Sequence, residues 1–202
     1  MISIVDYGAG NLRSVKNALE HLRARSRIIC TADNISNAKG LILPGDGSFG
    51  YMMKNLEKTK LTGAIREFIS GGKPFLGICL GMQALFEESE ESPGVAGLKI
   101  FRGSVIKFRK GKIPQIGWNK ISPKNSTAEY FSRSGYVYFV NSYHAVPYDK
   151  SIIACTSAYN GTFVSAIKRR NITAVQFHPE KSGKFGLMLL KGWTDEALGK
   201  NT

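Results

Sequence analysis

A cysteine in a glycine-rich stretch is the first residue of this sequence that could act as a nucleophile. Cys79 lies in Gly77-Ile78-Cys79-Leu80-Gly81, where an apolar run gives way to a helical pattern. This G-x-nucleophile-x-G spacing is typical of a nucleophile elbow, because side chains at the glycine positions would clash in the sharp turn from strand to helix. The helix N-terminus would lower the thiol pKa, and the Leu80 N–H could bind a developing oxyanion. A buried structural cysteine explains the same five residues equally well.

A thiolate nucleophile needs a base, and the sequence offers three histidines. His21 is expected on the surface of a helix, and His144 follows a strand without further signal. His178 follows an apolar run and is separated from Glu180 by one proline. Residues two apart at a strand end point the same way, so Glu180 could fix the imidazole tautomer and stabilise its protonated form. An exposed His-Pro-Glu turn is the alternative interpretation.

The composition is that of a globular protein with a basic surface. The chain has 202 residues, of which 43% are hydrophobic, and a formal net charge of +13. Residues 99–202 hold 17 of the basic and 5 of the acidic residues. These proportions exclude disorder of the whole chain. Because no apolar run reaches the ~18 residues of a membrane span and no secretory signal is visible, we predict a cytoplasmic protein without membrane association.

The cysteines do not indicate a metal site. Cys30, Cys79 and Cys155 are widely spaced, form no CxxC pair and have no histidine at zinc-ligand spacing. We therefore predict reduced thiols, no metal and no cofactor.

In the first half of the chain, predicted strands alternate with predicted helices. Short apolar runs predict strands at 2–6, 26–30, 40–43 and 74–78, and helical spacing predicts helices at 12–22 and 61–69. This alternation favours a mainly parallel sheet with helices on both faces.

The second half of the chain is richer in predicted strands. Runs rich in Val, Ile, Phe and Tyr predict antiparallel strands at 99–108, 136–141, 152–159, 162–168 and 171–176. The pair Asn160-Gly161 suits a tight hairpin turn, and an apolar face from Phe185 to Trp193 predicts a C-terminal helix. The fold class is therefore α/β: a single three-layer domain, residues 1–202, with a central mainly parallel (mixed) sheet and antiparallel strands in its C-terminal half.

The segments around Cys79 and His178 together resemble the signature pair of class I, triad-type glutamine amidotransferases. Further motifs resemble the glutaminase subunits of imidazole glycerol phosphate synthase, in family order and over essentially the whole length. In chain order, these motifs are Asp6-Tyr7-Gly8-Ala9-Gly10-Asn11-Leu12, Leu43-Pro44-Gly45-Asp46-Gly47-Ser48-Phe49-Gly50, Gly77-Ile78-Cys79-Leu80-Gly81-Met82-Gln83, Ile116-Gly117-Trp118-Asn119, Tyr138-Phe139-Val140-Asn141-Ser142-Tyr143 and Gln176-Phe177-His178-Pro179-Glu180-Lys181-Ser182.

The resemblance implies the class I glutamine amidotransferase fold and a catalytic triad. Cys79 would attack the side-chain amide of L-glutamine, His178 would take the thiol proton and pass it to the departing ammonia, and Glu180 would orient His178. Hydrolysis of the thioester would give glutamate. The oxyanion would be held by the Leu80 N–H and by a second backbone donor from Gly45, Asp46 or Gly47, where glycines permit a peptide flip.

The resemblance also implies which residues bind glutamine. The matching positions are Gly47, Gln83, Glu91, Ser142 and Tyr143. Glu91 suits the substrate ammonium, although it could equally be part of a solvated acidic turn.

Two positions depart from the family pattern. Asp46 replaces an apolar residue, commonly Val, and its carboxylate would oppose a developing negative charge unless it points outward. Asn141 replaces a common His, which leaves the triad untouched but could alter the contact with a partner.

Ammonia set free in water would protonate and diffuse away, so the family passes it to a synthase. The resemblance implies a heterodimer with a (β/α)8-barrel cyclase subunit that makes imidazole glycerol phosphate and aminoimidazole carboxamide ribotide, in histidine biosynthesis. Trp118, Tyr138 and Lys181 match interface positions. Aromatic residues in strands are more often core, which is the alternative for Trp118 and Tyr138.

Other functions fit the sequence less well. A related amidotransferase could supply ammonia to a different synthase, for example one that amidates a surface sugar. The basic charge alone suggests nucleic acid, but no recognition signature accompanies it, so we predict no nucleic-acid partner. Gly8-Ala9-Gly10 lacks the third glycine of a dinucleotide-binding loop. A catalytically inactive scaffold disagrees with the presence of all three triad residue types.

Overall fold

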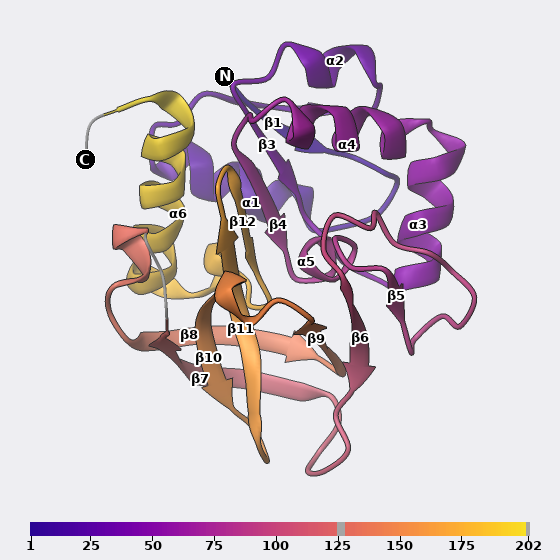
Figure 1. Cartoon of the computed structure of the whole chain (residues 1–202). Helices are drawn as coiled ribbons and strands as arrows, with labels where there is room; N and C mark the ends of the chain where they lie inside the picture. Colours follow the sequence, from indigo (N-terminus) through magenta and orange to yellow (C-terminus); the bar gives the residue numbers. More distant parts are fainter. Residues whose placement is uncertain (125–127, 201–202) are drawn as a thin grey trace.

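A mixed sheet runs through the centre of the molecule (Figure 1). The structure is a computed structural model that describes residues 1–124 and 128–200, so the predicted domain end at residue 202 lies outside the described residues. One half of the sheet is parallel, as expected. In spatial order its strands are β2 (Ser26–Ile29), β1 (Ile2–Val5), β3 (Gly40–Leu43), β4 (Phe75–Ile78) and β12 (Ile172–Val175).

The other half continues from β12 with antiparallel pairing. Its strands are β11 (Thr162–Arg169), β10 (Ile153–Ala158), β7 (Gln115–Pro123) and β8 (Gly135–Asn141). A small second sheet contains β5 (Glu88–Ser89), β6 (Gly103–Lys107) and β9 (Tyr143–Pro147).

Two details of the strand prediction change. The run at 171–176 was expected to be antiparallel, but β12 pairs parallel with β4 and antiparallel with β11, so it joins the two halves of the sheet. The strands β5, β7 and β9 were not predicted. In β7, Gly, Asn and Lys interrupt the apolar residues and much of the strand is exposed, so it lacks the pattern of a buried strand.

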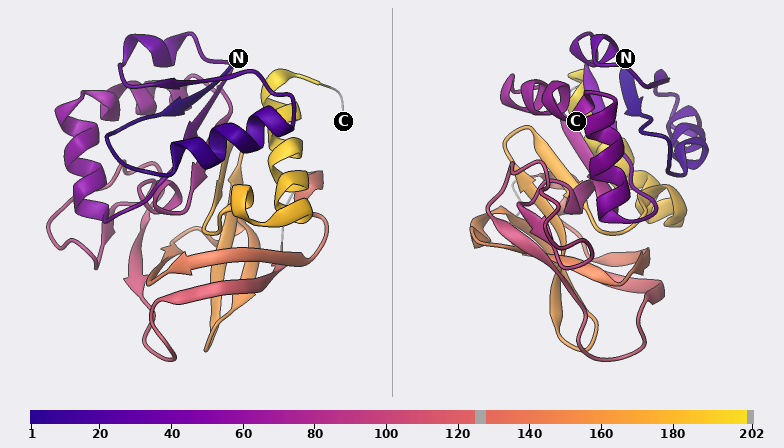
Figure 2. Two further views of the ribbon diagram at one scale, coloured as in Figure 1. Left: turned by 180° about the vertical axis from the view of Figure 1, so that it is seen from behind. Right: turned by 90° about the vertical axis from the view of Figure 1, so that its right-hand side faces the viewer.

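Helices cover both faces of the parallel half (Figures 1 and 2). On one face lie α1 (Leu12–His21), whose N-terminus is capped by Asn11, and α6 (Gly183–Leu198). On the other lie α2 (Asp33–Ser36), α3 (Phe49–Lys58) and α4 (Leu61–Ser70). The sequence prediction missed α2 and α3. The remaining helical segments are α5 (Leu80–Gln83) and the 3-10 turns η1 (Glu129–Phe131), η2 (Lys150–Ile152) and η3 (Pro179–Lys181).

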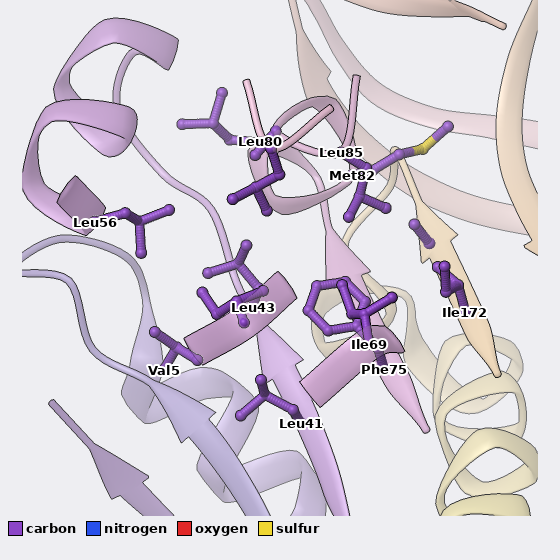
Figure 3. Close-up of a cluster of buried hydrophobic side chains, with 14 of the residues drawn as sticks. Val5, Leu41, Leu43, Leu56, Ile69, Phe75, Leu80, Met82, Leu85 and Ile172 are labelled. Atoms are coloured by element: carbon purple, nitrogen blue, oxygen red, sulfur yellow. The ribbon is translucent and has the colours of Figure 1, made fainter. Parts of the chain in front are cut away.

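Strand alternation divides the apolar core into two layers. In β3, Ile42 points toward α1 and α6, while Leu41 and Leu43 point toward α3 and α4. Figure 3 shows the second of these layers, with Leu56 of α3 and Ile69 of α4 packed near the β3 side chains. Each fully buried Leu or Ile contributes about 1.5–3 kcal/mol to the free energy of unfolding. This packing fixes the strands that carry the candidate site.

The loops after the parallel strands meet at one edge of the sheet. The last residues of β4 and β12, Ile78 and Val175, are register partners, and Leu43 at the end of β3 pairs with Gly77. The segments that begin at Pro44, Cys79 and Gln176 therefore start side by side. Open α/β sheets bind ligands at this edge. Within the part of the chain that the structure describes, no helix is long and apolar enough to cross a membrane.

Candidate active site

Cys79 occupies a strained turn between strand β4 and helix α5. Its backbone has φ 54° and ψ −109°, a combination that ordinary L-residues rarely adopt. The Cys79 N–H donates to Val175 O at 2.8 Å, which ties the turn to β12. Leu80 is the first residue of α5, so its N–H has no acceptor within the helix. This is the geometry that the nucleophile-elbow pattern predicts.

The glycines of the elbow allow three backbone segments to approach closely. A Cβ on Gly81 would lie 1.9 Å from Leu43 O, and one on Gly77 would lie 2.7 Å from Gly81 O. A Cβ on Gly45 would lie 2.4 Å from the Gly81 N atom. Because real Cβ atoms do not come so near to backbone atoms, only glycine fits at these positions.

His178 and Glu180 form a buried pair at the end of β12. His178 Nδ1 lies 2.8 Å from Glu180 Oε1, and the side chains of both residues are almost completely buried. The His178 N–H donates to Tyr138 O at 3.0 Å, so strand β8 holds the histidine backbone. Among the described atoms, His178 Nε2 has no hydrogen-bond partner. The exposed His-Pro-Glu turn considered from the sequence is therefore wrong.

The surroundings of His178 favour its protonated form. Burial alone would lower its pKa, but interaction with the Cys79 thiolate and the hydrogen bond and charge of Glu180 raise the pKa to about 10. A protonated imidazole next to a thiol can supply an acid beside a nucleophile.

Cys79 and His178 line a cavity of about 260 Å³ at the edge of the sheet. Every residue predicted to bind glutamine or to surround the oxyanion also lines it. The complete lining is Gly45, Asp46, Gly47, Cys79, Leu80, Gln83, Glu91, Pro114, Val140, Asn141, Ser142, Tyr143 and His178. Segments far apart in the sequence thus converge on one volume.

Two of these polar side chains are held by backbone groups. Glu91 Oε2 accepts the Phe49 N–H at 2.7 Å, at the N-terminus of α3, and the residue is half-buried. Glu91 does lie in a turn, but its carboxylate is fixed by this hydrogen bond and the residue lines the cavity. Gln83 is buried, and its Nε2 donates to Tyr143 O at 3.1 Å and to Gln176 Oε1 at 3.0 Å.

The backbone of Asp46 is held by Tyr7, a residue whose role the sequence did not reveal. The Tyr7 hydroxyl accepts the Asp46 N–H and donates to Asp46 O, both at 3.0 Å. In this conformation the Asp46 N–H points to Tyr7 rather than to Cys79. The Asp46 residue is exposed at the edge of the cavity.

Other lining residues were not singled out as contacts from the sequence. Pro114 and Val140 come from around β7 and β8, and Asn141 donates from Nδ2 to Tyr143 O at 3.0 Å. In the sequence, Val140 and Asn141 belong to the motif that begins at Tyr138, and Pro114 lies near the motif that contains Trp118. No other sequence feature points to them. Only the path of β7 and β8 brings them to the cavity.

The three residues predicted to contact a partner do not line the cavity, but they belong to segments next to residues that do. Trp118 of β7 and Tyr138 of β8 are cross-strand neighbours with ring centroids 6.2 Å apart. Trp118 is 57% exposed, which excludes a core role, and Tyr138 is half-buried. Lys181 is in η3, one residue after Glu180.

Strand alternation makes an exposed face around these rings. Ile116 and Tyr136 are also more than 60% exposed, and the register of β7 with β8 puts both on the Trp118 side. We call Ile116, Trp118, Tyr136 and Tyr138 the aromatic face. Val140, the register partner of Ile116, lines the cavity, so the face and the cavity adjoin.

The remaining histidines lie outside the cavity. His21 is exposed, as expected. His144 packs against Phe108, with ring centroids 4.8 Å apart, and burial lowers its pKa. Across residues 1–124 and 128–200, no three His, Cys, Asp or Glu side chains gather in a way that could hold a metal ion.

Comparison with known proteins defines the class. Residues 3–191 match the family model for glutamine amidotransferase class-I. The chain therefore belongs to the class-I glutamine amidotransferase family. A solved structure described as a glutamine amidotransferase superposes with a TM-score of 0.79 at 17% identity, covering 98% of this chain and 100% of that chain, which supports the fold.

The curated relatives with high sequence identity are imidazole glycerol phosphate synthase proteins. The imidazole glycerol phosphate synthase subunit HisH of Pyrococcus furiosus is 50% identical over 195 residues, which cover 95% of this chain and 97% of that protein. The chloroplastic imidazole glycerol phosphate synthase hisHF of Arabidopsis thaliana is 44% identical over 95% of this chain, but the match covers 33% of the longer plant protein. This chain therefore corresponds to one part of that longer protein.

Proposed function

We propose that this chain is the glutamine amidohydrolase subunit of imidazole glycerol phosphate synthase, acting in histidine biosynthesis. The similarity to HisH subunits over nearly the whole chain supports the assignment. The observation that carries the chemistry is the cavity that joins Cys79 to the buried His178–Glu180 pair. The proposed catalytic domain spans residues 1–202, and its place of action is the cytoplasm.

The first half of the reaction forms a thioester. Cys79 Sγ attacks the carboxamide carbon of glutamine, and its proton resides on His178. The Leu80 N–H donates to the oxyanion of the tetrahedral intermediate. His178 then protonates the leaving nitrogen, ammonia departs, and the C–N bond is replaced by a C–S bond.

Water completes the cycle. His178 takes a proton from a water molecule that attacks the thioester, and collapse of the second intermediate returns Cys79 and releases glutamate. Glu180 holds the imidazole through Nδ1 and stabilises its charge in both halves. Gly47, Gln83, Glu91, Ser142 and Tyr143 bind the glutamine, with the Glu91 carboxylate suited to its ammonium.

A second oxyanion donor requires a change in the segment Gly45-Asp46-Gly47. The Asp46 N–H is bound by Tyr7 in the present conformation, so this donor becomes available only when that hydrogen bond opens. The flanking Gly47, with φ 90°, already adopts a conformation that glycine reaches without strain.

The partner is a cyclase subunit, which we propose to be a (β/α)8 barrel that forms a heterodimer with this chain. The aromatic face, with Lys181 beside it, is the proposed contact surface. Large exposed aromatic side chains are enriched at such interfaces. Its position beside the cavity would let ammonia pass to the partner without entering bulk water.

One experiment tests the function. The purified chain is mixed with the cyclase or with other synthases, and glutamate release is measured with and without each acceptor substrate. We expect stimulation by the cyclase, and loss of glutamine-dependent synthesis in Cys79→Ala and in a His178→Ala variant, while synthesis from free ammonia persists. Stimulation by a different synthase alone would contradict the proposed partner, and glutamine-dependent synthesis by Cys79→Ala would contradict the nucleophile.

A further inference from the structure

Gln176 is a buried polar residue beside the nucleophile to which the triad assigns no role. It follows the last residue of β12, just as Cys79 follows the last residue of β4, and those last residues are register partners. The parallel register therefore sets the two side by side. Gln176 is fully buried, and its Nε2 lies 3.6 Å from Cys79 Sγ, within hydrogen-bond range for sulfur.

A chain of hydrogen bonds fixes which end of the Gln176 amide faces the sulfur. It begins at Tyr143 O, a backbone carbonyl that can only accept, so the end of Gln83 that faces it must be the NH2 group. The same NH2 group lies 3.0 Å from Gln176, which must therefore present its Oε1 there. The other end of Gln176, the donor Nε2, is left to face Cys79.

The sulfur receives opposing influences from its two polar neighbours. Val140 O lies 3.9 Å from Sγ and can accept only from a protonated thiol. Gln176 Nε2 donates, and a hydrogen bond donated to an ionised group stabilises the charged form. We propose that Gln176 is a positioning residue that holds and stabilises the Cys79 thiolate, with its amide orientation imposed by Gln83 and Tyr143. This inference rests on the proposed function, in which Cys79 is the nucleophile.

Several titratable groups also act on Cys79. His178 and Tyr7 interact with it through charge, and Asp46, Glu91 and Tyr143 line the same cavity. Gln176 differs from all of them because it is neutral. Because the Gln176 amide carries no charge at any pH, its hydrogen bond to Cys79 does not depend on the protonation of these groups.

The test measures the thiol pKa of Cys79 in the full chain, from the pH dependence of its alkylation by iodoacetamide, followed by mass spectrometry of the Cys79 peptide. The peptide readout separates Cys79 from exposed Cys30 and buried Cys155. Gln176→Leu removes the donor and Gln176→Glu replaces it with an acceptor of the same shape. We expect the pKa to rise by about one unit in the first variant, a tenfold loss of thiolate, and by more in the second.

Two further variants separate this role from a general effect on folding. Gln83→Leu removes the group that orients Gln176 without touching the sulfur, and should raise the Cys79 pKa by a smaller amount. Gln115→Glu is the matched control, because Gln115 is also buried but does not line the cavity. It should lower the melting temperature without changing the Cys79 pKa.

The outcomes for the inference and for the proposed function are distinct. If Gln176→Leu folds and its Cys79 pKa is unchanged, the role of Gln176 is overturned. If the Gln176 variants do not fold, an unchanged Cys79 pKa in Gln83→Leu has the same meaning. Both conclusions hold even if the wild-type chain releases glutamate with the cyclase. Failure of the wild-type chain to do so overturns the function, whereas the alkylation measurement still reports on the contact between Gln176 and Cys79.

Discussion

At the scale of single residues, the site depends on buried polar contacts that each involve one or two atoms. Glu180 is the strongest example, because its side chain is 1% exposed and its Oε1 faces His178 Nδ1 at 2.8 Å. Its Oε2 has no hydrogen-bond partner among the described atoms. A carboxylate in this position is costly to bury, and its interaction with the imidazolium offsets that cost.

Glu180→Gln should reduce kcat for glutamine hydrolysis on the order of 10²- to 10⁴-fold, because the amide does not stabilise the imidazolium. The pKa of His178 should fall below its value of about 10, since Glu180 helps to raise it. A raised histidine pKa stabilises the fold most at pH values below the unfolded pKa of about 6.5, and the contribution disappears as pH rises through the folded pKa.

The measurement is urea unfolding of the wild type and the variant from about pH 5 to pH 10. The difference in free energy of unfolding should be largest near pH 5 to 6.5 and shrink toward pH 10. Glu67→Gln, an exposed site on α4, is the control. A difference that grows with pH would contradict the assignment of the pair.

Tyr7→Phe should raise the glutaminase activity of the isolated chain. The change keeps the buried ring but removes the two hydrogen bonds that hold Asp46. Loss of about 1 kcal/mol of this restraint corresponds to a roughly fivefold rise in glutamate release without the partner. Tyr51→Phe is the control, because that hydroxyl makes only a 3.5 Å contact with Gly8 O. Unchanged or lower activity would show that Tyr7 does not restrain the oxyanion segment.

At the scale of elements, the site is an outcome of close packing between loops at the ends of β3, β4 and β12. The elbow glycines let the backbone after β4 touch the backbone after β3. The histidine loop is held from the other side, because Tyr138 of β8 accepts the His178 N–H and donates its own N–H to Ser182 Oγ at 2.9 Å. A strand of the aromatic face thus contacts the backbone of the catalytic loop directly.

Gly81→Ala should lower the free energy of unfolding by about 2–3 kcal/mol and abolish glutaminase activity, because the new Cβ would meet Leu43 O at 1.9 Å. Gly63→Ala is the matched control. Gly63 is the third residue of α4 and has no atom within 4 Å of an added Cβ, so alanine there should stabilise the helix by up to about 1 kcal/mol. Urea unfolding of both variants measures the two free energies of unfolding. Equal changes in the two variants would contradict the close packing proposed for the elbow.

At the scale of the whole molecule, the cavity lies next to an exposed face with large aromatic side chains. The two adjoin at the register pair Ile116–Val140, since Ile116 is 62% exposed while Val140 lines the cavity. The large mixed sheet contains both the strands of the aromatic face, β7 and β8, and the strands that end at the cavity, β4 and β12 (Figure 1). Contact on the face could therefore reach the catalytic loop through β8.

Trp118→Ala should raise the Kd for the cyclase by about 30-fold, the loss expected for an aromatic residue at the centre of an interface, about 2 kcal/mol. Isothermal titration calorimetry provides the measurement. Tyr148→Ala is the control, since Tyr148 is 71% exposed but lies outside the aromatic face, against Arg102. Equal losses from the two variants would show that the aromatic face is not the contact.

The sequence by itself determined the alternation of strands and helices, the nucleophile elbow and the short His178–Glu180 segment. These depend on spacing within a few residues, where backbone geometry alone dictates which side chains share a face. The sequence analysis did not predict helices α2 and α3 or strands β5, β7 and β9, and it gave β12 only antiparallel neighbours.

Only the tertiary structure decided how the site is completed. The Tyr7 contact with Asp46 spans 39 positions and the Gln176 contact with Cys79 spans 97, so no local pattern could report them. It also decided that Glu91 turns inward and that Trp118 faces outward. These outcomes depend on strand order and register, because pairing β4 with β12 is what brings Cys79, His178 and Gln176 to the same edge of the sheet.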